Sequence, residues 1–399
     1  MNKIYKNKTH KNKIYKNKTH KNRTHKNKKC KITNIPSLDK DITAIIDIKA
    51  LRNNVRILKN TSGTDIMPVL KADAYGHGIV EMAKILRKIG IKYLGVATIG
   101  EAILLRKSGD KGRILAWLYD ISRDEFKDSI GLNLDIAIFD EKLIPQIKDM
   151  IPSGIKLKVT MFIDTGINRA GISYNKAIQA FKDVVSCDKF ELIGMMSHLV
   201  CSQIKNSPIV NEQLRKFREL RKNLQNIGIR PPLVHIANTG ACLNYDVSDF
   251  TLSRSGKGIY GIFENEKLKP IMTLKTYIIQ LKDVNKGEGI SYDWKYIAKK
   301  NTKIAVLPLG YADVIPRISS GKLNVYVNGT KRKVFGTISM DQIIIESKEK
   351  DKINDDVILF GNGVNCPQTV LKLAKYCETT PSEILCHIGY RVNRIYVNK

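Results

Sequence analysis

Residues 67–78 read MPVLKADAYGHG, and this stretch carries the strongest signal in the chain. The apolar run that ends at Leu70 predicts a buried strand, and Lys71 follows it directly, where such a strand enters a loop. A lysine beside apolar walls loses hydration, which lowers the pKa of its amine and makes it a usable nucleophile. Gly76 and Gly78 then open a helical stretch whose N-terminus can bind an anion. The alternative is an ordinary surface lysine that closes a strand.

Apolar strands alternate with amphipathic helices around and beyond this stretch. The predicted strands are 67–71, 93–98, 113–118, 134–139, 156–163, 191–198, 233–237 and 250–254. The clearest helices between them are 77–89, 174–186 and 209–226. Eight strands with intervening helices over roughly 200 residues predict an α/β fold, a closed (β/α)8 TIM-like barrel. An open doubly wound sheet is the alternative.

Short strands replace the helices from about residue 270. They are predicted at 271–281, 303–308, 323–327, 331–336, 341–346 and 356–360. Asn328-Gly329 lies between two of them and predicts a two-residue hairpin. We therefore predict a barrel over 41–265 and a mostly β C-terminal domain over 266–399.

The N-terminal tail, 1–40, differs in composition from the rest. Residues 1–31 hold twelve lysines, one arginine and no acid, and so carry 13 of the 30 net positive charges. The tail repeats IYKNKTHKNK and is too polar to bury a core, which predicts a disordered low-complexity segment. Weak, nonspecific binding to polyanions is its functional interpretation, and an extension without a role is the other.

No apolar run is long enough for a transmembrane span, so no membrane association is predicted. The seven cysteines lack paired metal spacing, and the Lys-, Asn- and Ile-rich body predicts a cytoplasmic protein with free thiols. His198 and Cys201 lack two further ligands at suitable spacing, so no metal site is predicted.

The candidate site residues follow predicted barrel strands, at the end where barrel enzymes build their sites. They are Lys71 and Tyr75 after the first of the eight, Arg169 after the fifth, His198 after the sixth, Asn238 and Thr239 after the seventh, and Arg254 and Gly256 after the eighth. Each one alone has an ordinary explanation as a cap, a turn or a surface charge. Together they predict one site at one rim.

The string VLKADAYGHG resembles the pyridoxal-phosphate lysine motif of the alanine racemases, and the resemblance runs from about Asp41 to Tyr396. It implies a barrel followed by a β domain that also takes in a first strand at 43–48. It implies that Lys71 carries pyridoxal 5'-phosphate as a Schiff base. It assigns the cofactor phosphate to Tyr75, Thr239, Gly256, Lys257 and Tyr390.

The resemblance also assigns the remaining roles. Arg254 faces the pyridine nitrogen, which then stays unprotonated, and His198 packs against the ring. Lys71 serves one face of the substrate Cα, and Tyr292, in GEGISY, serves the other. The substrate carboxylate is held by Arg169 and by the Met340-Asp341 segment. In the family Tyr292 and Met340 reach the barrel of the partner subunit, which implies a homodimer with shared sites.

Four positions depart from the usual family pattern. Phe162 stands where the family often has a lysine, so Arg169 must be oriented otherwise. Val314 and Asp293 replace glycines, and Asp293 places an acid directly beside Tyr292. Asn393 replaces a proline. None of these changes removes a catalytic group.

The resulting prediction is an isomerase that interconverts L- and D-alanine for peptidoglycan synthesis, with Tyr390 keeping the pocket narrow. A racemase of broader substrate range is the nearest alternative. A barrel-type amino-acid decarboxylase is disfavoured by Arg254, because decarboxylation benefits from a strong electron sink. A nucleic-acid-binding protein on an inactive barrel is disfavoured by the intact pair Lys71 and Tyr292.

Overall fold

The computed structural model describes residues 42–362 and 366–398. The predictions for the tail, 1–40, lie outside the described residues. Across the described ranges, no helix is both long enough and apolar enough to span a membrane. Every cysteine in these ranges is free, as predicted.

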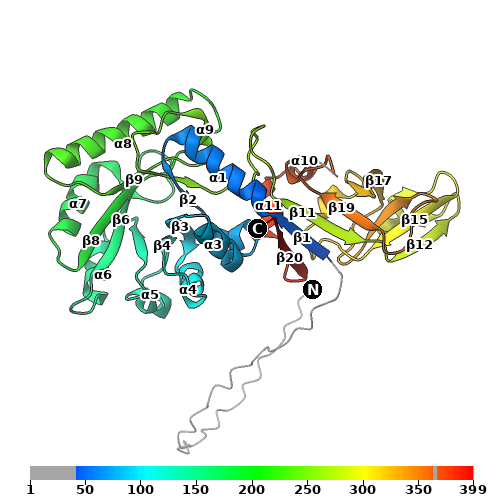
Figure 1. Ribbon diagram of the computed structural model, residues 1–399, viewed down its shortest axis with the longest axis horizontal. Helices are drawn as coiled ribbons and strands as arrows, with labels where there is room; N and C mark the ends of the chain where they lie inside the picture. Colours follow the sequence, from blue (N-terminus) through cyan, green and yellow to red (C-terminus); the bar gives the residue numbers. More distant parts are fainter. Residues whose placement is uncertain (1–41, 363–365, 399) are drawn as a thin grey trace, which may run out of the picture. The chain divides into compact units, whose positions relative to one another are not determined.

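Eight parallel strands of the described chain form the barrel (Figure 1). They are β2 (Asp65–Pro68), β3 (Tyr93–Thr98), β4 (Arg113–Leu118), β5 (Asp135–Ile138), β6 (Leu157–Asp164), β8 (Phe190–Met196), β9 (Leu233–His235) and β10 (Leu252–Ser255). The prediction of a closed barrel is confirmed, because β10 pairs with β2 and leaves no open edge there. The Leu70 amide donates to Gly95 O at 2.8 Å, and the Arg254 amide donates to Ala237 O at 2.9 Å, which joins the remaining neighbours.

Helical segments precede or follow the barrel strands, and the longer ones bury one apolar face each. They are α1 (Ile48–Ser62), α2 (Lys71–Gly76), α3 (Ile79–Lys88), α4 (Ile99–Lys107), α5 (Asp124–Ser129), α6 (Leu143–Met150), α7 (Ala177–Val185), α8 (Pro208–Asn226) and α9 (Thr239–Asn244). In α3 the buried positions Ile79, Met82, Ala83 and Leu86 recur every three or four residues, as a helix packed on a sheet requires. A short strand, β7 (Ile172–Ser173), pairs with β6 beside the ring.

The mostly β part contains a nine-stranded sheet in the described residues, in the order β12-β15-β18-β17-β16-β19-β11-β1-β20. Its strands are β1 (Ile42–Asp47), β11 (Met272–Tyr277), β12 (Gln280–Val284), β15 (Thr302–Leu307), β16 (Asn324–Val327), β17 (Thr330–Phe335), β18 (Ile343–Ser347), β19 (Asp356–Phe360) and β20 (Val392–Val397). Smaller elements are β13 (Gly289–Ile290), β14 (Tyr296–Ile297), α10 (Val370–Tyr376) and α11 (Pro381–Cys386).

Two details of this part bear on the sequence predictions. The hairpin at Asn328-Gly329 is confirmed: both residues have positive φ, 46° and 75°, and Val327 pairs with Thr330. The single strand predicted at 271–281 is wrong, because the chain leaves one strand at Tyr277 and starts the next at Gln280.

The first strand belongs to the nine-stranded sheet, where β1 runs antiparallel to β11 and parallel to β20. The chain then enters the barrel through α1, whose cap is the Asp47 side chain, which accepts from the amides of Lys49 and Ala50. The last strand, β20, returns to the same sheet and contacts the segment that follows Lys71. The first and last strands of the described chain therefore lie side by side in this sheet.

Candidate active site

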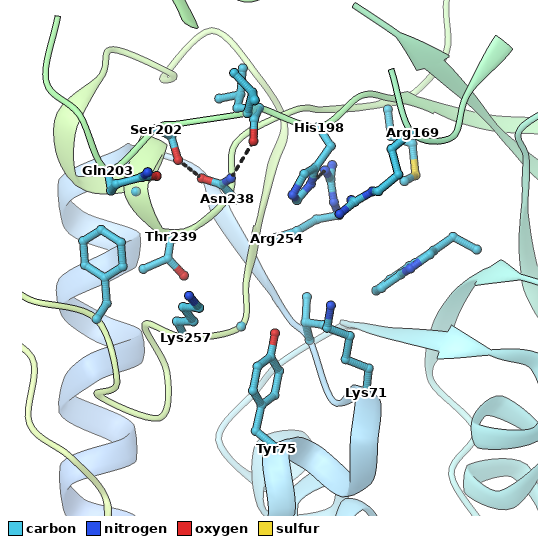
Figure 2. Close-up of a pocket in the computed structure, with 18 of the residues that line it drawn as sticks. Lys71, Tyr75, Arg169, His198, Ser202, Gln203, Asn238, Thr239, Arg254 and Lys257 are labelled. Atoms are coloured by element: carbon cyan, nitrogen blue, oxygen red, sulfur yellow. Dashed lines mark hydrogen bonds between the residues drawn. The ribbon is translucent and has the colours of Figure 1, made fainter. Parts of the chain in front are cut away.

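A cavity of about 390 Å³ opens at the carboxyl ends of the barrel strands (Figure 2). Nine predicted site residues line it: Lys71, Tyr75, Arg169, His198, Asn238, Thr239, Arg254, Gly256 and Lys257. They come from the ends of five strands, or from the loops that follow. Because parallel strands in a barrel all end at one rim, residues far apart in the sequence meet there.

Lys71 begins α2 and is partly buried in the cavity wall. Burial lowers the pKa of its amine, and the neighbouring Arg169 guanidinium lowers it further. The amine is therefore more easily deprotonated than a solvated lysine, as the strand-end position predicted. Figure 2 shows the Lys71 side chain pointing into the cavity beside Tyr75.

A left-handed turn follows Lys71. Ala72, Asp73, Ala74 and Tyr75 all have φ between 52° and 54°, although the segment contains no glycine before Gly76. Left-handed backbone costs roughly 1–2 kcal/mol for each such residue, so tertiary contacts must hold this turn. It brings Lys71 and Tyr75 to the same cavity.

The predicted anion site at the N-terminus of the following helix is wrong. Asp73 Oδ1 accepts from the Ile79 amide at 2.8 Å, so an internal carboxylate already occupies the start of α3. This helix end does not line the cavity. Asp73 thus satisfies an amide that a ligand would otherwise need to reach.

Figure 2 shows Tyr75, Thr239 and Lys257 on one side of the cavity, and Gly256 lines the cavity next to Tyr75. A Cβ at position 256 would lie 2.5 Å from the Tyr75 hydroxyl, so only glycine lets that ring approach the strand end. Burial raises the pKa of Tyr75 well above its usual range, which keeps the hydroxyl protonated. Thr239 Oγ1 accepts from the Gly258 amide at 3.0 Å and so ties the loop to α9.

Arg254 crosses the floor of the cavity, fully buried. Its guanidinium donates to His235 Nδ1 and to His235 O, both at 2.7 Å, and to Ser197 O. Burial lowers the pKa of Arg254 to about 10, so the group remains charged near neutral pH.

Two histidines lie against this charge. Burial and then Arg254 lower the pKa of His198 to about 3, so its ring is neutral near neutral pH. His235 is also held neutral, well below its usual pKa, by burial and by Arg254. Because Arg254 can only donate, His235 Nδ1 must accept, which fixes the tautomer of this ring. His235 was not predicted as a site residue, although it lies three residues before Asn238.

Four predicted site residues do not line the cavity in the single chain. Tyr292, Met340 and Tyr390 are 64%, 52% and 85% exposed, respectively. Asp341 also lies outside the cavity and forms an ion pair with Arg391 at 2.7 Å. All four belong to the mostly β part of the chain, whereas the cavity residues belong to the barrel.

The family models "Alanine racemase, N-terminal domain" and "Alanine racemase, C-terminal domain" match residues 46–264 and 271–396. The chain belongs to the alanine racemase family. The alanine racemase of Thermodesulfovibrio yellowstonii is 35% identical over 368 residues, which cover 90% of this chain and 99% of that protein. That of Mycolicibacterium smegmatis is 31% identical over 366 residues, covering 88% of this chain and 94% of that protein.

Solved alanine racemase structures agree with this assignment. The enzyme from Streptomyces coelicolor A3(2) superposes with a TM-score of 0.85 at 32% identity, covering 90% of this chain and 98% of that one. The enzyme from Clostridium difficile 630 superposes with a TM-score of 0.84, also at 32% identity, covering 90% of this chain and 96% of that one. The likeness therefore spans both the barrel and the β part.

Phe162, where an alanine racemase often has a lysine, lines the cavity with its side chain buried. It packs with Met67, Met196 and Leu252 in an apolar layer inside the barrel. Arg169 has no side-chain hydrogen bond or ion pair among the described residues, so its guanidinium is available to a ligand. Trp117, Ser202 and Gln203 also line the cavity and were not predicted, because no local pattern distinguishes them.

Proposed function

We propose that this protein racemises alanine, interconverting the L and D forms, with pyridoxal 5'-phosphate held in the barrel cavity. The observation that carries the proposal is the convergence of Lys71, Arg254 and the Tyr75–Gly256 contact on one cavity. Membership of the alanine racemase family supports the same reaction. D-alanine made in the cytoplasm would supply peptidoglycan synthesis.

The cavity residues fit this cofactor. Lys71 offers an amine of lowered pKa for covalent attachment. At the other end, Tyr75 and Lys257 offer a hydroxyl donor and a positive charge for a phosphate, beside a Gly256 backbone that a Cβ would block. When bound, the cofactor withdraws electrons from the bonds to the substrate Cα.

Arg254 is assigned to the ring nitrogen of the cofactor. Its guanidinium is fixed by Ser197 O and by His235, so it offers donors and no acceptor to that nitrogen. Because Arg254 keeps its own proton, it would leave that nitrogen unprotonated, and the cofactor would then be a weaker electron sink. The arrangement favours return of a proton to Cα over decarboxylation or transamination. His198, neutral and beside Arg254, is assigned to pack on the ring; Asn238 and Thr239 support the phosphate end.

Racemisation needs a proton donor and acceptor on each face of Cα. Lys71 is assigned to one face and Tyr292 of the partner subunit to the other. Tyr292 is exposed and lies outside this chain's own cavity, which supports a site completed by a second copy. Arg169 and the partner's Met340-Asp341 segment are assigned to the substrate carboxylate, and Tyr390 to the cofactor phosphate.

The test is deuterium incorporation at Cα in D₂O, started separately from L- and D-alanine and followed by chiral chromatography. Both enantiomers should reach an equal mixture and acquire one deuterium. Lys71→Ala is the matched control and should abolish both reactions. Release of carbon dioxide, or no D-alanine from L-alanine with cofactor present, would contradict the proposal. Parallel assays with serine, lysine and arginine distinguish a broad-specificity racemase.

A further inference from the structure

The left-handed turn after Lys71 is held from two sides. From the barrel, Glu101 Oε1 accepts from the Ala72 amide at 2.7 Å, while Glu101 Oε2 accepts from the amides of Ala97 and Thr98. This carboxylate also completes the capping box that starts α4. The residue directly after Lys71 is therefore tied to the end of β3.

From the nine-stranded sheet, Arg394 of β20 forms a hydrogen bond and an ion pair with the same turn. Its Nε donates to Gly76 O at 2.8 Å, and its Nη2 forms an ion pair with Asp73 Oδ2 at 3.1 Å. Asp73 in turn accepts from the Ile79 amide through its other oxygen. One guanidinium therefore connects the middle of the turn, its end and the start of α3. The Arg394 side chain is mostly shielded from water, whereas the Asp73 side chain is half-exposed.

Tyr396, two residues along β20 and on the same face of the strand, adds a second contact. Its hydroxyl donates to His77 O at 2.8 Å. A Cβ at Gly78 would lie 2.3 Å from that hydroxyl, and a Cβ at Gly76 would lie 2.0 Å from Leu385 O in α11. The turn thus fits closely between β20 and α11, and both glycines are required for this fit.

Contacts within the turn also link its position to that of Tyr75, which lines the cavity. His77 Nδ1 donates to the carbonyl oxygens of Ala74 and Tyr75, both at 2.9 Å. The His77 ring stacks on Tyr260 with centroids 4.5 Å apart, and Tyr260 in turn lies 5.0 Å from the Tyr75 ring. A shift of the turn would therefore move Tyr75 and Lys71 together.

We propose that Arg394 and Tyr396 are positioning residues: β20 holds the strained turn so that Lys71 and Tyr75 present their side chains to the cavity. They act through the turn, since neither residue lines the cavity. This inference rests on the proposed function, because it assigns the β20 contacts a role in that reaction. The C-terminal strand of the nine-stranded sheet thereby controls the geometry of a barrel residue more than 300 positions earlier in the chain.

The test compares Arg394→Met with Arg332→Met in the full-length protein. Arg332, in β17 of the same sheet, forms a buried ion pair with Asp351 and does not contact the turn, so it is a control for lost stability. Backbone hydrogen exchange over 71–79 is measured on protein stripped of cofactor. We expect exchange there to accelerate about tenfold or more in Arg394→Met, as for opening of a local structural unit. Arg332→Met should lower the melting temperature and leave this segment unchanged.

Kinetics of the cofactor-loaded enzyme give the second measurement. Arg394→Met should lower kcat about tenfold in both directions with a smaller change in KM, because Lys71 is misplaced relative to bound substrate. Arg394→Lys, which can keep the ion pair with Asp73 but not the contact with Gly76 O, should recover part of this loss. Equal effects of the methionine variants at 394 and 332 on exchange over 71–79 would overturn the proposal.

If Arg394→Met does not fold, Tyr396→Phe decides the question, since it removes only the hydroxyl that donates to His77 O. Faster exchange over 71–79 in this variant supports the proposal, and wild-type exchange overturns it. The exchange result is independent of the reaction. A wild-type protein that fails to racemise alanine would refute the proposed function and leave the positioning test valid.

Discussion

Gly256→Ala isolates the close approach between the barrel rim and Tyr75. The added Cβ would lie 2.5 Å from the Tyr75 hydroxyl and 3.0 Å from its Cζ, well inside van der Waals contact. Position 256 follows β10 directly, so its backbone has little freedom to retreat. Tyr75 is buried against Tyr260, and its hydroxyl end must instead swing toward the open cavity. The space it would enter is the proposed phosphate site.

The size of the effect follows from overpacking. Adding one methyl group to a well-packed site costs about 1–3 kcal/mol. The cofactor-free protein can relieve this strain by moving Tyr75, whereas bound cofactor must push the ring back. The cost therefore appears mainly in cofactor affinity, as roughly a 5- to 150-fold rise in Kd at about 1.4 kcal/mol per factor of ten.

Titration of the cofactor-free protein with pyridoxal 5'-phosphate, followed by visible absorbance, measures this Kd. Gly361→Ala is the matched control, because its added Cβ would meet its nearest atoms no closer than 3.2 Å, at Thr273. Tyr75→Phe removes the atom in closest conflict, so Gly256→Ala should cost less in that background. An unchanged Kd for Gly256→Ala, or the same cost in both backgrounds, would refute the reasoning.

Three further predictions concern Lys71, the subunit arrangement and the tail. Mixing inactive Lys71→Ala with inactive Tyr292→Phe should restore about a quarter of the activity, since half the re-formed dimers carry one intact site; no recovery after proven exchange contradicts sharing. Burial lowers the pKa of Lys71 from 10.5, so its protonation destabilises the cofactor-free protein below that pH. In urea titrations, the free energy of unfolding of the wild-type protein, relative to that of Lys71→Met, should therefore be lowest below the folded-state pKa of Lys71. It should recover as pH rises toward 10.5, and a difference that does not depend on pH would contradict this. Deleting residues 1–31, with their 13 positive charges, should leave turnover unchanged and weaken retention on DNA, most clearly at low salt.

The barrel and most of its rim could be predicted from the sequence because both depend on local patterns. Apolar runs such as 113–118 mark buried parallel strands, and β4 has those bounds in the structure. Polar residues directly after such runs must lie at one rim, which is how Arg169, His198 and Arg254 could be placed together. The resemblance to the alanine racemases then supplied their roles, beyond what the spacing could show.

The left-handed turn could not be predicted. Ala72 and Ala74 favour right-handed helix, and nothing local in Ala-Asp-Ala-Tyr requires positive φ. The conformation depends on Arg394 and Tyr396, which follow it by more than 300 residues, and on the Glu101 carboxylate from another strand. Local propensity is overridden here by contacts that a one-dimensional pattern does not contain.

The hydrogen-bond partners of Arg254 could not be predicted from the sequence for a related reason. The guanidinium was placed at the rim, but its fixed orientation comes from Ser197 O, directly after β8, and from His235 in β9. A backbone carbonyl has no sequence signature at all. Arg169 shows the converse: Phe162 packs into the apolar layer, and no described side chain takes over the orienting role expected of a lysine there.

The barrel and the mostly β part contribute different groups to the proposed site. Barrel strands end at fixed positions on a closed ring, so they suit the groups that must hold a cofactor at rest, such as Arg254 and Gly256. The mostly β part supplies β20, which contacts the turn carrying Tyr75 within the same chain, and its β13–β14 segment carries the exposed Tyr292 proposed to serve a partner. A change that disturbs the whole mostly β part would then affect one chain's lysine and the other chain's tyrosine at once. Exchange of the Cα proton should therefore slow on both faces when the mostly β part is perturbed, whereas Tyr292→Phe should slow it mainly on the face assigned to Tyr292.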